Sequence, residues 1–192
     1  MARRRRTATE NLDSGVLPAD VYQANYLSQQ RLIDDLAYVT EAVVPPAAGV
    51  GNTSDEELEV IPWHIRKLYR DFPTSLVHND YHVKNLVIQR GRLTPVDWPG
   101  AHLGPHLGDL YALLGETANN GVARDEVVEA YVSELGGANI REIKWQIEIG
   151  GTCWLIRTLR WLIEVGAPAI PIMRPWIPDL AKDLSTLARR LG

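Results

Sequence analysis

Apolar residues recur at helical spacing along most of this chain. Steps of three, four and seven residues between them place their side chains on one face of a helix. The helices predicted in this way cover residues 18–43, a segment that begins near Leu58, the stretch "DLYALLGE" from Asp109, residues 125–135, residues 139–165 and a final segment from Trp176. Pro45 and Pro46 end the first helix, and Pro62 is expected to kink the second, because proline lacks the N–H that a helix interior needs.

One stretch follows a different pattern. The segments "SLV" before His78, "LVI" at residues 86–88 and "LTPV" at residues 93–96 are short and rich in residues that favour strands. Residues 89–92 separate the last two, a length that is typical of a hairpin connection. We expect no other β region, so the predicted fold class is mainly α with a small β-hairpin (α+β).

Length and composition indicate one globular domain. The chain has 192 residues, of which 45% are hydrophobic and 23% charged, and this is enough apolar material for a single core. Arg3 to Arg6 form a basic run, and we expect residues 1–17 to be a disordered basic tail ahead of a domain at residues 18–192. The net charge of −4 at pH 7 gives no reason to expect nucleic acid as a partner.

The sequence gives no sign of a membrane or an oxidising compartment. It has no continuous apolar run of the ~18 residues that a membrane-spanning helix requires. Its single cysteine, Cys153, has no internal disulfide partner and lies in an apolar stretch, where a buried thiol is expected. The predicted location is therefore cytoplasmic.

The segment "HNDYHVKN" concentrates side chains that bind metals or move protons. One hypothesis is a metal cluster, because His78, Asp80 and His82 alternate and would share one face of a strand, with His102 and His106 available downstream. Such a cluster would suit a His/Asp metallohydrolase. Sites of that kind draw their ligands from a rigid β framework, however, which this pattern does not predict. We expect His102 and His106 in surface or loop positions.

A second hypothesis is phosphoryl transfer. Asp80 and Asn85 are five residues apart, and Asp97 follows the hairpin, seventeen residues after Asp80. This order resembles the kinase catalytic loop H-x-D-x-x-x-x-N, which is followed by a second aspartate that holds metal. The reaction needs a carboxylate that meets the attacking hydroxyl, and Asp80 fits this need. It also needs hard oxygen ligands for Mg²⁺, which Asn85 and Asp97 can supply.

A resemblance to a known family covers about forty residues, "LVHNDYHVKNLVIQRGRLTPVDWPGAHLGPHLGDLYALL". The stretch resembles the catalytic core of the aminoglycoside phosphotransferase and choline kinase-like family, a branch of the protein-kinase-like fold. Members read H-G-D-x-H-x-x-N, then a hairpin and I-D-W, then G-x-x-x-x-D-L. The resemblance implies that Asp80 is the catalytic base and that Asn85 and Asp97 are metal ligands. It also implies that the catalytic loop is supported by His78, His82 and Asp109.

The resemblance implies an enzyme that transfers the γ-phosphoryl group of ATP or GTP, with Mg²⁺, to a hydroxyl of a small molecule. Acceptors in the family include aminoglycosides, macrolides, choline, homoserine and sugars, and the sequence does not choose among them. Asn79 replaces the usual glycine. Lys84 is either a solvated lysine or a cation that reaches the transferring phosphoryl group.

Kinase-like enzymes also have an N-terminal lobe with a glycine-rich loop and a strand lysine, and this sequence shows neither. Lys67, the only lysine before the motif, lies in a helical pattern, while Gly49 and Gly51 follow two prolines. The chain is therefore expected to be a C-terminal lobe alone. A separate chain could supply the missing lobe, or the start could be truncated. The alternative function is a non-catalytic lobe that binds a partner protein.

Overall fold

The computed structural model describes residues 26–43, 57–136 and 138–192, and this part is mainly helical with two small antiparallel sheets. The helices are α3 (Gln29–Val43), α5 (Ile61–Asp71), α6 (Gly108–Asn119), α7 (Arg124–Glu134), α8 (Ile140–Trp161), α9 (Ala167–Ala169) and α10 (Trp176–Leu191). The strands are β1 (Ser75–Val77), β2 (Leu86–Gln89), β3 (Arg92–Pro95) and β4 (His102–Gly104). The predicted class, mainly α with a small β component, is confirmed.

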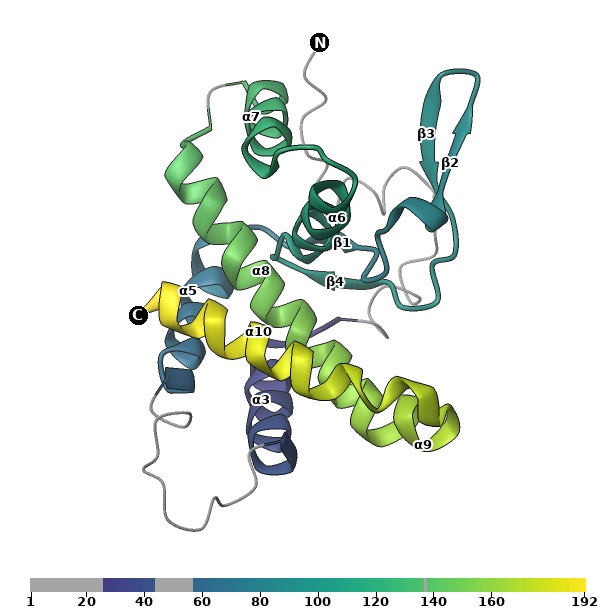
Figure 1. The fold of residues 1–192 in the computed structure, drawn as a ribbon. Coiled ribbons are helices and arrows are strands. Elements are labelled where there is room, and N and C mark those ends of the chain that lie inside the picture. The colour runs from purple at the N-terminus through teal and green to yellow at the C-terminus, as the bar shows by residue number, and fades with distance from the viewer. Residues whose placement is uncertain (1–25, 44–56, 137) are drawn as a thin grey trace.

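Helix α8 is the central element, and α3, α5, α6, α7 and α10 all contact it (Figure 1). Asn139 begins this helix, because its side-chain oxygen accepts a hydrogen bond from the N–H of Arg141. Its second half carries Leu155, Ile156 and Leu159, which are fully buried in the main core between α3, α5 and α10. The helix continues through a π-helical turn at Leu162–Gly166 into α9.

A smaller core lies between α6, α7 and the first half of α8. It is built from Leu107, Leu114, Val128, Ile143 and Ile147. The glycine pair in the middle of α8 lets α6 approach closely, since a Cβ on Gly150 would lie 2.6 to 2.7 Å from backbone atoms of Leu107 and Gly108. The start of α6 is therefore fixed against the central helix.

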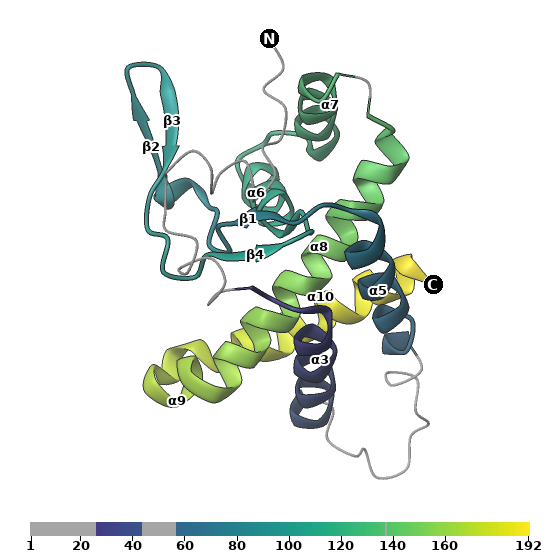
Figure 2. The ribbon, with the colours of Figure 1, turned by 180° about the vertical axis from the view of Figure 1, so that it is seen from behind.

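The segment from β1 to α6 contains two small sheets of two strands each. Strand β2 pairs with β3 through a two-residue turn, in which Arg90 and Gly91 have φ of 51° and 72°. This is the predicted hairpin, and it projects away from the helices (Figure 2). Strand β1 pairs with β4, with Val77 opposite His102. The expectation of no second β region was wrong, because β4 has only three residues and too little sequence for a periodic signal.

Two helix predictions need correction. Tyr26 forms a bridge with Leu103 and is not helical, and α3 begins at Gln29, after Ser28 has capped the N–H of Arg31 with its hydroxyl. Residues 18–25 of the predicted first helix, like the tail at residues 1–17, lie outside the described residues. Pro62 does not kink α5 but lies in its first turn, where the missing N–H costs nothing.

A buried carboxylate joins α3 to α8. Asp35 is fully buried, and its oxygens lie 2.9 Å from Arg31, 3.4 Å from Arg157 and 2.6 Å from Arg160. Three guanidinium groups compensate for the cost of removing this charge from water. Elsewhere in the core, Cys153 is buried as predicted. None of the helices within the described ranges is long and apolar enough to cross a membrane.

Candidate functional site

The loop after β1 brings Asp80 and Asn85 together. A 3-10 turn at Val83–Asn85 returns the chain toward Asp80, and the side-chain N–H of Asn85 donates to Oδ2 of Asp80 at 2.8 Å and to its backbone carbonyl at 3.0 Å. Asn85 is buried, whereas the side chain of Asp80 is 57% exposed. The amide therefore fixes the orientation of a carboxylate that stays open to a ligand.

His78 and His82 lie on either side of Asp80. The imidazole of His78 is buried, accepts from the N–H of Asp80 at 3.3 Å through Nδ1 and donates from Nε2 to the carbonyl of Val96 at 2.9 Å. Its ring also packs on Trp98, with centroids 4.4 Å apart. His82 places Nε2 3.3 Å from Oδ1 of Asp80. Both histidines thus contact the loop at the point where the predicted base stands.

Asp109, in the first turn of α6, holds the same loop through its carboxylate. Its carboxylate accepts from the backbone N–H groups of His78 at 2.7 Å and Asn79 at 2.8 Å. Burial raises the pKa of the Asp109 carboxyl, against the opposing effect of these two hydrogen bonds. Asn79 has a φ of 69°, a left-handed conformation that asparagine tolerates better than most residues. This backbone explains how asparagine can stand where glycine is usual.

The hairpin returns the chain to the same place. The N–H of Val96 donates to the carbonyl of Asn85 at 2.9 Å, so that Asp97 follows directly after a backbone contact with the loop. Asp97 is exposed and has a φ of 64°, a strained conformation of the kind that gathers at functional sites. Within the described residues its carboxylate makes no hydrogen bond or ion pair, with Asp80 and Asn85 or with any other group.

The donor set fits a hard divalent ion. Because the side-chain nitrogen of Asn85 is committed to Asp80, the amide oxygen is left without a hydrogen bond among the described residues. The carboxylate of Asp97 is equally unengaged. One amide oxygen and one carboxylate are the kind of ligands that Mg²⁺ takes when water and phosphate oxygens fill its other positions. The fit lies in the chemistry of the donors, since the two side chains do not touch.

The metallohydrolase hypothesis finds no support. Across residues 26–43, 57–136 and 138–192, no three histidine, cysteine, aspartate or glutamate side chains gather where they could hold a metal ion. His102 and His106 were expected in surface or loop positions. This was wrong for His102, which lies in β4, whereas His106 lies in the loop between β4 and α6. Both are buried, and their Nε2 atoms lie 3.0 Å apart in a hydrogen bond. The sequence did not predict their burial, because two histidines that hydrogen-bond to each other leave no trace in the pattern of apolar and polar residues.

Two further residues hold the loop that the sequence motif did not identify. Trp154 of α8 donates from its indole N–H to the carbonyl of Asn79 at 3.1 Å. Glu116 of α6 accepts the N–H of Val83 at 2.6 Å. Trp154 lies within the predicted helix at residues 139–165, and its hydrogen-bond partner is a backbone atom. No sequence pattern reports such a contact.

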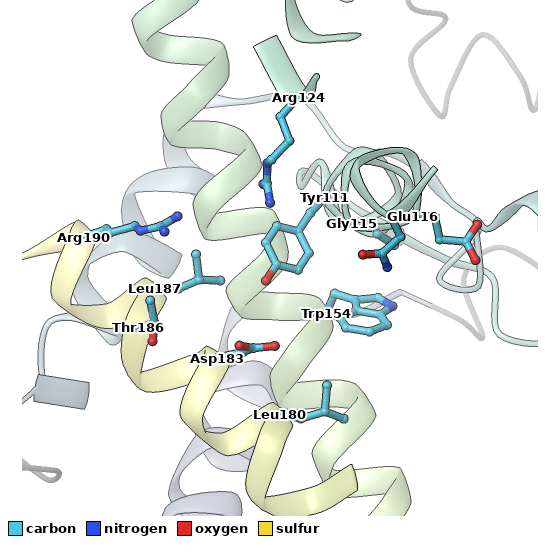
Figure 3. Close-up of a pocket in the computed structure, with 12 residues that line it drawn as sticks. Tyr111, Gly115, Glu116, Arg124, Trp154, Leu180, Asp183, Thr186, Leu187 and Arg190 are labelled. Atoms are coloured by element: carbon cyan, nitrogen blue, oxygen red, sulfur yellow. The ribbon is translucent and has the colours of Figure 1, made fainter. Parts of the chain in front are cut away.

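A cavity opens beside Asp80 and adjoins a second, larger one. The smaller has a volume of about 310 Å³ and is lined by Asp80, Lys84 and residues of α6 and α8. The larger, of about 460 Å³, lies between α6, α8 and α10 and is closed at one end by the start of α7 (Figure 3). Ala112, Glu116 and Trp154 line both cavities. A ligand could therefore extend from Asp80 into the larger space.

Comparison with known proteins gives one informative result. The model of the phosphotransferase enzyme family matches residues 14–145. This range is more than half of the chain and includes the loop with Asp80, the hairpin and α6. A search of curated proteins found no match.

Proposed function

This chain belongs to the phosphotransferase enzyme family, and from that premise we propose that it transfers the γ-phosphoryl group of ATP or GTP to a hydroxyl group of a small molecule. The observation that carries the proposal is the pairing of Asp80 with Asn85. An exposed carboxylate is oriented by a buried amide at the edge of a cavity of about 310 Å³. Phosphoryl transfer needs little more from a protein than such positioning and the stabilisation of charge.

Asp80 is the proposed catalytic base. With one carboxylate oxygen held by Asn85 and the other 3.3 Å from His82, it has a fixed direction toward the cavity. It accepts a hydrogen bond from the acceptor hydroxyl and takes the proton as the oxygen attacks phosphorus. His78, His82 and Asp109 are the proposed supports of this loop, and their contacts with its backbone and with Asp80 support that role.

Asn85 and Asp97 are the proposed ligands of Mg²⁺. The ion, when bound, offsets the negative charge of the donor phosphates. Asn85 then serves two groups, its nitrogen holding Asp80 and its oxygen facing the ion. The positive φ of Asp97 is maintained by the hairpin, because the N–H of Val96 donates to the carbonyl of Asn85 and the carbonyl of Val96 accepts from Nε2 of His78.

We assign the described part of the chain to a protein-kinase-like C-terminal lobe. The order of elements supports this assignment: a strand, the loop with Asp80 and Asn85, a hairpin, Asp97 and a helix that begins with Asp109. Lys84 lines the smaller cavity together with Asp80 and forms no ion pair within the described ranges. This position supports the proposal that its ammonium group contacts the transferring phosphoryl group.

The test is nucleotide turnover by the full chain with ATP or GTP, Mg²⁺ and a panel of hydroxylated amines, hydroxy acids and sugars. Loss of a general base typically costs ~10² to 10⁴ in rate, so Asp80→Asn should reduce turnover by about a hundredfold or more. The matched control is Asp34→Asn, an exposed aspartate on α3. Equal rates for wild type and Asp80→Asn would remove Asp80 from the reaction.

The hairpin favours a second candidate, a lobe that binds another polypeptide. Ile88 is 75% exposed and Leu93, its partner across the strands, is 52% exposed. Large apolar side chains on an exposed hairpin are a common mark of an interaction surface. Calorimetry with Mg²⁺-nucleotide and light scattering separate the two candidates. A chain that binds no nucleotide but associates stably, and loses that association in Ile88→Lys, would favour the second.

A further inference from the structure

Two arginines without an ion-pair partner lie at one end of the larger cavity. Arg124 begins α7 and Arg190 lies in the last turn of α10, and both line the cavity of about 460 Å³. Neither side chain forms a hydrogen bond or ion pair with another described residue. The guanidinium carbon of Arg124 lies 5.9 Å from the ring centroid of Tyr111, and Figure 3 shows both arginines reaching toward that ring.

Two acidic residues lie near this end of the cavity, and neither forms an ion pair with Arg124 or Arg190 among the described residues. Glu148 of α8 interacts electrostatically with both arginines, and burial raises the pKa of its carboxyl against that effect. Asp183 of α10 lines the same cavity and acts on Tyr111, but it pairs with neither arginine. Arginine groups that converge on a cavity in this way match the oxygens of a carboxylate or a phosphate.

The opposite end of the cavity leads to Asp80. Glu116 and Trp154 line both cavities, and Figure 3 shows Glu116 across the pocket from the arginines. The ring of Trp154 and the side chain of Leu180 form an apolar wall between the two ends. One small ligand can therefore place a hydroxyl near Asp80 and a second group between Arg124 and Arg190.

We propose that the acceptor is a hydroxylated molecule with an acidic group at the end away from its reacting hydroxyl, held by Arg124 and Arg190. This inference rests on the proposed function, because it takes Asp80 as the point where the hydroxyl lies. Asp183 faces the middle of the cavity and disfavours a second acidic group on the acceptor. The acceptor class is thus a compound with one carboxylate or phosphate group.

The experiment measures binding to the full chain by ligand-observed NMR and needs no turnover. The probes are 4-hydroxybutyrate and 6-hydroxyhexanoate, each beside its neutral primary amide, with inorganic phosphate as a competitor. Wild type should bind at least one carboxylate about tenfold or more tightly than its amide, since a guanidinium pair recognises the charge. The double variant Arg124→Gln/Arg190→Gln should lose this preference.

The matched control is Arg66→Gln/Arg141→Gln, which removes the same charge from exposed positions outside the cavity. It should keep the preference for the carboxylate. Equal affinity for carboxylate and amide, absence of binding by all probes, or an unchanged preference in the Arg124/Arg190 variant would overturn the proposal. Charge-dependent binding without phosphoryl transfer would instead keep the pocket and remove the proposed function.

Discussion

The indole N–H of Trp154 donates to the backbone carbonyl of Asn79 at 3.1 Å, and this bond joins the longest helix to the loop that carries Asp80. Asn79 has a left-handed φ of 69°, so its carbonyl is not aligned for pairing with a neighbouring strand. The indole N–H supplies the hydrogen-bond donor that this backbone carbonyl requires. The central helix therefore sets the position of the loop as well as the core.

Trp154→Phe keeps most of the ring and removes this donor. We expect a loss of ~1 kcal/mol in the free energy of unfolding, the usual net value of one hydrogen bond. Loss of this bond lets the loop with Asp80 shift, and a misplaced base raises the reaction barrier. We expect phosphoryl transfer to fall about tenfold, which corresponds to a barrier higher by ~1.4 kcal/mol. Chemical denaturation and turnover measure the two effects. The control is Trp176→Phe at an exposed position of α10; equal behaviour of the two variants would contradict the proposed role.

Gly150 sets the distance between α8 and the start of α6. A Cβ at this position would lie 2.6 Å from the carbonyl carbon of Leu107 and 2.7 Å from the nitrogen of Gly108, and backbone cannot yield as a side chain does. Gly150→Ala should therefore reduce the free energy of unfolding by ~1 to 3 kcal/mol or more. Asp109 comes directly after Gly108 and holds the loop with Asp80, so a shift of α6 should lower turnover as well.

Gly115 offers a control on the same helix α6. A Cβ there meets nothing within 4 Å, so Gly115→Ala should leave stability unchanged or raise it by up to ~1 kcal/mol through the higher helix propensity of alanine. Thermal and denaturant unfolding compare the two variants. Tolerance of alanine at position 150 would mean that the helices can separate without cost.

The sequence predicted those parts of the site that depend on residues close together in the chain. Asp80 and Asn85 are five residues apart in one loop, and the hairpin before Asp97 was predicted from the connection at residues 89–92, although residues 89 and 92 are themselves paired in the strands. Apart from Asp109, which the family resemblance assigned to the support of the loop, contacts across long sequence distances were not predictable. Trp154 bonds a carbonyl 75 positions away, and the arginines at 124 and 190 meet at one cavity only because α7 and α10 both pack on α8.

Helix boundaries failed for a related reason. Tyr26 continues the apolar spacing of α3, but its backbone is used in a bridge with Leu103, a tertiary contact that outweighs helix periodicity. Pro62 was expected to kink a helix, while in the fold that helix simply starts one residue before it. In both cases the type of residue was recognised correctly, as apolar for Tyr26 and as a residue that restricts a helix for Pro62. Their conformation, however, depends on the surrounding structure.

Asp35 should be the most sensitive charge in the main core. Its fully buried carboxylate faces Arg31, Arg157 and Arg160, so Asp35→Asn would leave three cations around a neutral amide. Breaking a buried ion pair in this way costs ~3 kcal/mol or more. The neighbour Asp34 is exposed, and Asp34→Asn should change the free energy of unfolding by less than ~0.5 kcal/mol. Similar unfolding midpoints for the two variants would show that the ion pairs of Asp35 with the three arginines contribute little to stability.

His102 and His106 form a neutral hydrogen-bonded chain. His106 accepts the N–H of Gly108 through Nδ1, so its Nε2 donates to Nε2 of His102, whose Nδ1 in turn donates to the carbonyl of Gly100. Each ring thus uses both nitrogens in its uncharged form. Burial is the main cause that lowers the pKa of His102 to about 4 and that of His106 to about 3, with Arg157 adding to both effects.

Acid should therefore destabilise the fold through this pair before most carboxylates titrate. Both histidines have an ordinary value of 6.5, so the unfolded chain takes up protons below that pH while the folded chain does not. Stability from the pair is complete above pH 6.5 and is lost as the pH falls toward about 4, by on the order of 3 kcal/mol for each histidine. Denaturant unfolding between pH 7.5 and 4.5 measures this slope. His102→Gln keeps an acceptor for His106 and removes one titrating group, so its slope should be about half that of wild type; identical slopes would show that the pair is not the acid-sensitive element.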